Sequence, residues 1–159
     1  PVLPSARRAN ELFARLPEGT PHRFRLRERQ ARLEQMAGLT EDALKHFQEV
    51  VAHNRAAGNK EDLGAVLGNL ANLNVRLGHL DAAQEHYREA LQIHRERGDR
   101  RREGVVLGNL GIYHWGQGSL DEALAHFDQA LVIHRETGNR ATEATVVGNL
   151  AILYRNSIR

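Results

Sequence analysis

The sequence has no cysteine, few aromatic residues and only four prolines. Without cysteine, disulfides and thiolate metal sites are excluded, and a reducing, cytoplasmic setting is favoured. Because aromatic residues make up only 5% of the chain, the core has to be built from Leu, Ala, Val and Ile. No apolar run approaches the length of a membrane span, and the N-terminus has no signal-peptide pattern. We therefore expect no membrane association.

The charge balance is nearly neutral, with a formal net charge of +2. This value is too small to make nucleic acid the expected partner. Lys45 and Lys60 are the only lysines, so arginine supplies almost all of the positive charge. That bias fits bidentate recognition of anions, and it equally fits the codon usage of a GC-rich genome. The chain begins at Pro1 without Met and stops at Arg159 in mid-pattern, so we expect a piece of a longer protein.

A forty-residue repeat organises most of the chain into blocks 38–77, 78–117 and 118–157. The last two blocks are identical at 19 of 40 positions, far more than composition alone would produce. Units of this size cannot bury a core alone, so neighbouring blocks have to stack. The positions that agree in all three blocks include Gly38/78/118, Ala43/83/123, His46/86/126, Gly58/98/138, Val66/106/146, Gly68/108/148, Asn69/109/149 and Leu70/110/150.

Each block contains two helices at apolar spacing of helical period. We expect the first helices at about 40–57, 80–97 and 120–137, and the second at about 60–77, 100–117 and 140–156. Gly58, Gly98 and Gly138 suit a left-handed residue that ends a helix, and the Asn or Asp that follows can cap the next one. Ser119 and Glu122 have capping-box spacing. The core stripes of the second helices are Val66, Leu70, Leu73 and Leu77; Val106, Leu110 and Tyr113; and Val146, Leu150 and Leu153.

The residues before the blocks predict two further helices. One begins at Ser5, carries Leu12 and Phe13, and caps the array from within residues 1–20. The other, at about 22–37, places Leu26, Leu33 and Ala37 on one stripe. The predicted fold is all-α, an α-solenoid of antiparallel helical hairpins. Its array spans 21–159, with hairpins at about 21–58, 59–98 and 99–138 and a closing helix at 139–157.

Leu110-Gly111, Gly118, Ala123, Phe127 and Ala130 resemble the tetratricopeptide repeat, whose hairpins use these residue types at this spacing. The second block repeats the pattern fully and the first less fully, so the resemblance covers about residues 22–157. Two features depart from the usual repeat: the period is forty instead of thirty-four, and Arg95 and Arg135 replace the usual Pro. In both features the chain resembles the long-repeat branch of kinesin light chains and Pins-type adaptors. Many bacterial signalling proteins carry similar arrays. The resemblance implies a right-handed superhelix whose inner helices line a groove for an extended peptide.

One stripe on the inner helices is left over once the core is assigned. The Asn at its centre offers a donor and an acceptor together, which suits clamping of a peptide backbone, and family members use Asn there in this way. The alternative is that these Asn residues only tie adjacent repeats together or face water. The candidate peptide-binding residues are Asn69, Asn72, Arg76, Asn109, Ile112, Trp115, Asn149 and Ile152.

Arg25, Arg29 and Arg32 fall in the same register on the Arg-rich helix. They would make one end of the groove electropositive and favour an acidic partner. A solvated charged face explains them equally well. Gly68, Gly108 and Gly148 lie within helices, where close approach of a neighbouring helix accounts for them.

The nine histidines do not form a metal motif. His46, His86 and His126 recur on successive outer helices and are expected to form a ladder on the surface. No HExxH, phosphate-binding glycine loop or GxSxG pattern occurs, and no nucleophile–base pair stands out. We expect no metal site, no cofactor and no enzymatic activity.

The predicted function is a protein-interaction scaffold that binds an extended peptide. One alternative is a regulatory segment of a larger signalling or transcription protein. Another is a self-assembling module, because Val146, Leu150 and Leu153 of the closing helix are expected to be exposed and could form a homodimer contact.

Overall fold

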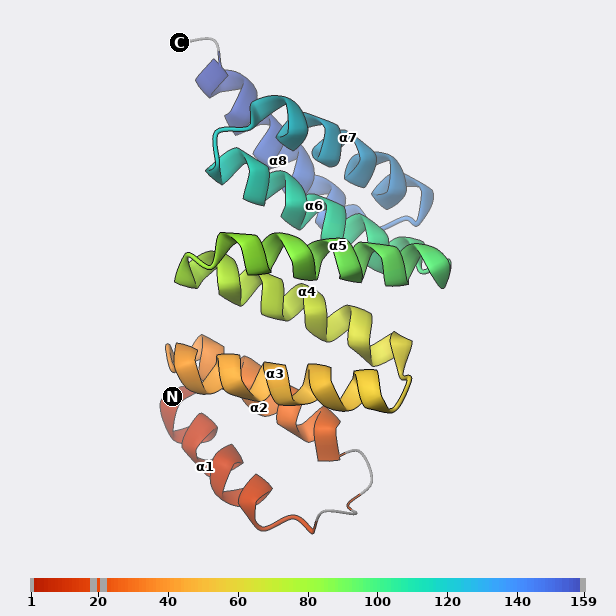
Figure 1. Ribbon diagram of the computed structural model, residues 1–159. Helices are drawn as coiled ribbons and strands as arrows, with labels where there is room; N and C mark the ends of the chain where they lie inside the picture. The colour runs from red at the N-terminus through yellow and green to blue at the C-terminus, as the bar shows by residue number, and fades with distance from the viewer. Residues whose placement is uncertain (1, 18–19, 21–22, 158–159) are drawn as a thin grey trace. The chain divides into compact units, whose positions relative to one another are not determined.

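The computed structural model describes residues 2–17, 20 and 23–157. All regular structure in this part of the chain is helical (Figure 1). The helices predicted from the forty-residue period end within one residue of the observed ends, and the prediction of an all-α helical-repeat fold is confirmed. The helices are α1 (Val2–Ala14), α2 (Arg23–Met36), α3 (Thr40–Ala56), α4 (Lys60–Leu77), α5 (Leu80–Glu96), α6 (Arg100–Gly116), α7 (Leu120–Glu136) and α8 (Arg140–Ser157).

The turns between paired helices follow the predicted glycine chemistry. Gly58, Gly98 and Gly138 have φ values of 65°, 66° and 65°, in the left-handed region that favours glycine. Asn59 Oδ1 accepts from the backbone N–H of Asp62 at 3.3 Å, which satisfies one free donor at the start of α4. The short turns thereby reverse the chain and place successive helices side by side.

One predicted helix start and one predicted capping interaction are wrong. Helix α1 begins at Val2 instead of Ser5, because Pro4 falls in its first turn, where a missing N–H costs little. Ser119 is the N-cap residue of α7, but its side chain makes no capping hydrogen bond, so the capping box with Glu122 does not form.

The chain divides into two compact units, residues 1–86 and 87–159. In the first unit, α1 packs on α2, α2 on α3, and α3 on α4. The predicted stripe of α4 is buried, with Val66, Leu70 and Leu73 at 0–1% exposure. Other large residues of this core are Phe13, Phe47, Val50 and Leu67.

The buried face of α2 is largely polar, and the prediction that Leu26 lies on its apolar buried stripe is wrong. Leu26 is 41% exposed, whereas Gln30 and Glu34 are buried. The Glu34 carboxylate accepts from Gln30 Nε2 and Asn10 Nδ2, both at 2.8 Å. It also lies 2.6 Å from His46 Nδ1 on α3. Burial of these groups is tolerated because α1 and α3 supply partners on both sides.

The same contact overturns the expected surface ladder of histidines at its first member. His46 is only 8% exposed, since its ring points toward Glu34. His86 is half-buried, with Nδ1 3.4 Å from Asn74 Nδ2. In the second unit, His126 is half-buried and stacks on His114 with ring centroids 5.1 Å apart.

In the second unit, α7 packs against α6, and α8 contacts both. Close helix approach occurs at Gly104 and Gly111 of α6. A Cβ added at Gly111 would lie 2.5 Å from Phe127 Cδ1, and one at Gly104 would lie 2.8 Å from His134 Cε1. These two glycines let α7 approach the α6 backbone.

The glycines singled out from the sequence behave differently. A Cβ at Gly108 would meet Val146 Cγ2 at 3.7 Å, an ordinary contact distance. A Cβ at Gly148 would meet nothing within 4 Å, so close approach as an explanation of this glycine is wrong for the chain as described.

The expected exposed stripe of α8 is also wrong. Val146, Leu150 and Leu153 are 2%, 9% and 1% exposed, because α6 and α7 both pack against that side of the helix. The exposed large apolar residues of α8 lie elsewhere on the helix, at Val147, Ile152 and Tyr154.

Candidate functional site

In the first unit, two of the predicted groove residues are tied to the neighbouring helix. Arg25 Nε lies 3.2 Å from Asp62 Oδ2, which links α2 to α4. Asn69 Nδ2 donates to Glu28 Oε1 at 3.3 Å and links the same two helices. For Asn69, this geometry favours the role of joining adjacent repeats.

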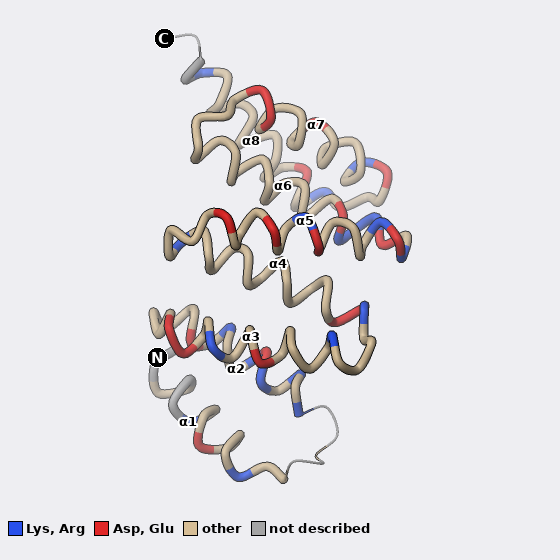
Figure 2. The backbone as a smooth tube through the Cα atoms, viewed as in Figure 1, with Lys and Arg blue, Asp and Glu red and all other residues tan. Residues whose placement is uncertain are grey.

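The basic residues predicted on this unit are accessible. Arg29 and Arg32 on α2 and Arg76 on α4 are exposed, and Asn72 is half-buried. Figure 2 shows the basic residues along α2. Since Asp62 neutralises Arg25, the available positive charge comes from the other three arginines.

In the second unit, the equivalent positions form a surface of amide and apolar groups. Asn109 and Asn149 are half-buried on α6 and α8, which contact each other. One turn farther along each helix, Ile112 and Ile152 are 46% and 41% exposed. Trp115 is half-buried. An extended segment could bury side chains on the isoleucines while its backbone meets the amides.

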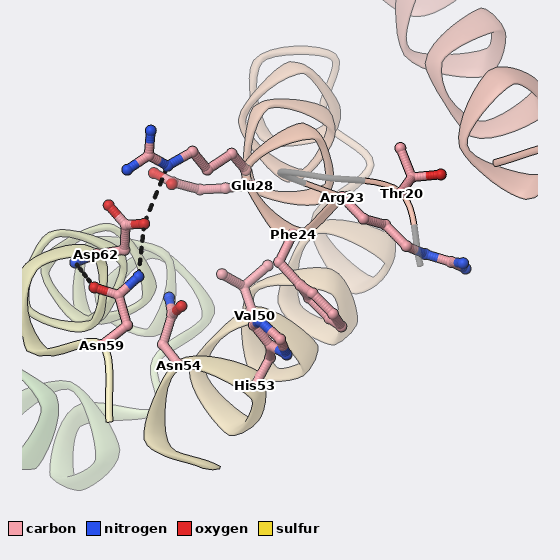
Figure 3. Close-up of a pocket in the computed structure, with 10 residues that line it drawn as sticks. Thr20, Arg23, Phe24, Glu28, Val50, His53, Asn54, Asn59 and Asp62 are labelled. Atoms are coloured by element: carbon pink, nitrogen blue, oxygen red, sulfur yellow. Dashed lines mark hydrogen bonds and ion pairs between the residues drawn. The ribbon is translucent and has the colours of Figure 1, made fainter. Parts of the chain in front are cut away.

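A polar pocket of about 310 Å³, which the sequence did not predict, lies among α2, α3 and the start of α4 (Figure 3). On one side, the rings of Phe24 and His53 stack with centroids 3.6 Å apart and an interplanar angle of 8°. On the other side, Asp62 accepts from Asn59 Nδ2 at 2.9 Å and pairs with Arg25. The residues lining it are Thr20, Arg23, Phe24, Arg25, Glu28, Val50, His53, Asn54, Asn59 and Asp62.

Asn54 is the distinctive residue of this pocket. It is 4% exposed, and its side-chain amide makes no hydrogen bond with another described residue. The corresponding residue in the last block is His134, which packs against Gly104. Phe24 of α2 lies at the repeat position that Gly104 occupies in α6, two periods of forty residues later. An alignment of the first hairpin with the later blocks would have shown in the sequence that Phe24 and Asn54 replace a glycine and a histidine.

The first unit also has an apolar groove of about 490 Å³ between α1 and α2. Leu12 and Leu26, which belong to the apolar sides predicted for these two helices, are 50% and 41% exposed there. Leu16 and Leu33 complete its apolar lining.

Neither a metal cluster nor a membrane helix is found in the described part of the chain. Its His, Asp and Glu residues do not gather in threes with the geometry of a metal site. None of its helices combines the length and apolar character that crossing a bilayer requires.

The family model of the tetratricopeptide repeat matches residues 23–96 and 102–157. The chain belongs to the tetratricopeptide repeat family. Tetratricopeptide repeats generally mediate protein–protein interaction, and the family is typically a non-enzymatic scaffold. A search of curated proteins finds no match.

Several solved structures share the tetratricopeptide fold. BtubC (BKLC) from P. vanneervenii is 20% identical, with a TM-score of 0.84 over 96% of this chain and 66% of that one. Aspartyl phosphate phosphatase F from Bacillus subtilis is 16% identical, with a TM-score of 0.75 over 93% of this chain and 38% of that one. A putative kinesin light chain with nearly identical TPR-like repeats from Podospora anserina is 15% identical, with a TM-score of 0.71 over 99% and 89%. The chain thus spans less than two thirds of the first two proteins.

Proposed function

We propose that the chain is a non-catalytic scaffold that holds an extended segment of a partner protein along its inner helices. The observation that carries this proposal is the pairing of half-buried Asn109 and Asn149 with exposed Ile112 and Ile152 at the same repeat positions of adjacent helices. Rigid helices that present such groups need little ordering when they bind.

Charge in the first unit favours an acidic partner segment. Arg29, Arg32 and Arg76 are exposed, and none of them forms an ion pair with another residue that the structure describes. Guanidinium groups bind carboxylates through paired hydrogen bonds. The absence of cysteine is consistent with a cytoplasmic setting for this interaction.

The proposal contains no chemical step. Two buried carboxylates join neighbouring helices: Glu34 of α2 lies against His46 of α3, and Glu103 of α6 pairs with Arg95 of α5. Such groups, engaged between helices, are not positioned to act on a bound substrate.

Selection from a random-peptide display library tests the function directly. Peptides enriched on the unaltered chain should contain acidic residues and should bind the Asn109→Ala/Asn149→Ala variant at least about tenfold more weakly. Gln129→Ala, on the exposed side of α7, is the matched control and should leave affinity unchanged. Melting temperatures of all variants should agree. Equal affinity of the double variant and the unaltered chain would reject the inner-helix site.

A further inference from the structure

The polar pocket of the first unit is formed by helices that have neighbours on both sides in the chain. Its walls come from α2, α3 and the start of α4, while α1 precedes these helices and α5 follows them. All of its lining residues belong to the unit of residues 1–86. Asn109 and Asn149 belong to the other unit, so a ligand bound in this pocket would add to the scaffold function instead of repeating it.

The pocket exists because the first hairpin departs from the repeat at two positions. In the last hairpin, His134 is fully buried and packs on Gly104, where an added Cβ would lie 2.8 Å from His134 Cε1. In the first hairpin, Phe24 and the shorter Asn54 stand at these two positions. The histidine that fills this space in the last hairpin is therefore missing from the first.

The Asn54 amide is buried but has no partner in the fold. The residue is 4% exposed, and its side chain makes no hydrogen bond with any residue that the structure describes. In Figure 3, its nitrogen and oxygen point away from α3 into the pocket. A buried amide without partners is unfavourable, so a ligand that supplies both a donor and an acceptor would be stabilised here.

The charges around the pocket cancel when His53 is counted as neutral. Arg23 and Arg25 line it together with Glu28 and Asp62. Arg25 Nε lies 3.2 Å from Asp62 Oδ2, and Arg23 Nη1 donates to a backbone carbonyl at 3.1 Å. Glu28 accepts from an amide of α4 at 3.3 Å. A charged ligand would thus meet no excess of opposite charge, and its desolvation favours a neutral ligand instead.

The other wall of the pocket is aromatic. The Phe24 and His53 rings stack at 3.6 Å, and Val50 adds apolar surface beside them. A flat apolar body suits such a wall because aromatic groups pack against one another in stacked or edge-on arrangements. The volume of about 310 Å³ lies at the lower end of the range for small-molecule sites. Size and shape therefore favour a single substituted ring.

We propose that this pocket binds a small, neutral aromatic carboxamide. The carbonyl oxygen of the ligand would accept from Asn54 Nδ2, and its N–H would donate to Asn54 Oδ1. Its ring would lie against the aromatic wall. A carboxylate at the same place lacks the donor and brings a net charge, and a ketone lacks the donor.

Benzamide is the probe that tests this proposal. Titration into the isotope-labelled chain, followed by NMR, should give saturable shifts of the Asn54 side-chain amide and of backbone amides around the pocket. Benzoate and acetophenone replace the amide nitrogen with a charged oxygen and a methyl group. Both should bind at least about tenfold more weakly than benzamide.

Variants of the chain test the role of the buried amide. Asn54→Leu should abolish saturable binding and should leave the melting temperature unchanged or higher, because it removes an unpaired buried amide. Gln48→Leu, which removes an exposed amide from the same helix, is the matched control and should bind benzamide normally. Phe24→Gly combined with Asn54→His copies the last hairpin and should abolish binding by filling the pocket.

The proposal is wrong if benzamide causes no saturable shifts at the pocket, if benzoate or acetophenone binds as tightly, or if Asn54→Leu leaves the affinity unchanged. A lower melting temperature of Asn54→Leu would also contradict it, because the amide would then have a partner within the fold. Tighter binding of N-acetylglutamine amide than of benzamide would show that a glutamine side chain of a partner protein occupies the pocket instead. Asn109→Ala/Asn149→Ala should not change benzamide binding, so a failure of the inner-helix site and a failure of this pocket are distinguishable.

Discussion

His46 Nδ1 lies 2.6 Å from Glu34 Oε2, and the residues forty positions later form the equivalent contact. Asn74 and His86 approach to 3.4 Å. In the second unit, His114 and His126 occupy the same two positions and stack their rings. The same two repeat positions thus join successive helices in three ways. The contact is a carboxylate with a histidine at the first pair, an amide with a histidine at the second, and two stacked rings at the third.

Replacement of Glu34 with alanine should destabilise the first unit by about 3 kcal/mol, because it leaves Gln30, Asn10 and His46 without their common acceptor. Urea unfolding measures this free energy. Glu85→Ala, at an exposed carboxylate on α5, is the control and should change stability by no more than about 0.5 kcal/mol. Equal effects of the two substitutions would show that the buried network is unimportant for stability.

Alanine at two helical glycines should have opposite effects. Gly111→Ala should destabilise by about 2 kcal/mol, because its Cβ would overlap the Phe127 ring. Gly148→Ala should stabilise by up to about 1 kcal/mol, since nothing lies within 4 Å and alanine favours the helix. Thermal unfolding of both variants compares them directly. A loss of stability at Gly148 would indicate that its face is already covered.

The two arginines that replace the usual repeat proline should differ in importance. Arg95 and Arg135 each lie 2.9 Å from a glutamate of the next helix. The side chain of Glu103 is 6% exposed, whereas that of Glu143 is 28% exposed. Arg95→Ala should therefore cost about 1 kcal/mol and Arg135→Ala less than about 0.5 kcal/mol in urea unfolding. The reverse order would contradict this ranking by burial.

The second unit should lose stability in weak acid. Burial lowers the pKa of His134, although Glu143 and the Gly104 backbone oppose the shift. Burial also lowers the pKa of His126, helped by the positive charge of His114 and Arg95 and opposed by Glu122.

Well above the ordinary histidine pKa of about 6.5, both histidines are neutral in the folded and the unfolded chain. Below it, the unfolded chain takes up protons that the folded chain resists, so stability falls until the pH has passed through the lowered pKa values. His134→Asn, which copies the residue at position 54, should flatten this dependence in unfolding measured from pH 8 to pH 5. An unchanged slope would exclude His134 as its source.

The sequence predicted the helices well because the forty-residue comparison reinforced every turn signal three times. Helix α2 precedes the clear repeats, so its face was assigned from Leu26 and Leu33 alone. Its polar buried side depends on partners in α1 and α3, which no local pattern contains.

The site was predicted less completely. Asn109, Ile112, Asn149 and Ile152 lie on accessible parts of their helices, as register alone indicates. The exposed side of α8 was predicted wrongly. The helical period of apolar residues identifies an apolar stripe, but it does not show which neighbouring helices cover that stripe. The interaction of Asn69 with Glu28 required the geometry of two helices together.

The first hairpin has Phe24 and Asn54 at the two positions where the last hairpin has Gly104 and His134. The two hairpins therefore pack differently at these positions. Histidine at 54 would need the room that the Phe24 ring occupies, and glycine at 24 would remove the ring that stacks on His53. Any shuffling of blocks, by recombination or by design, would therefore have to move positions 24 and 54 as a linked pair.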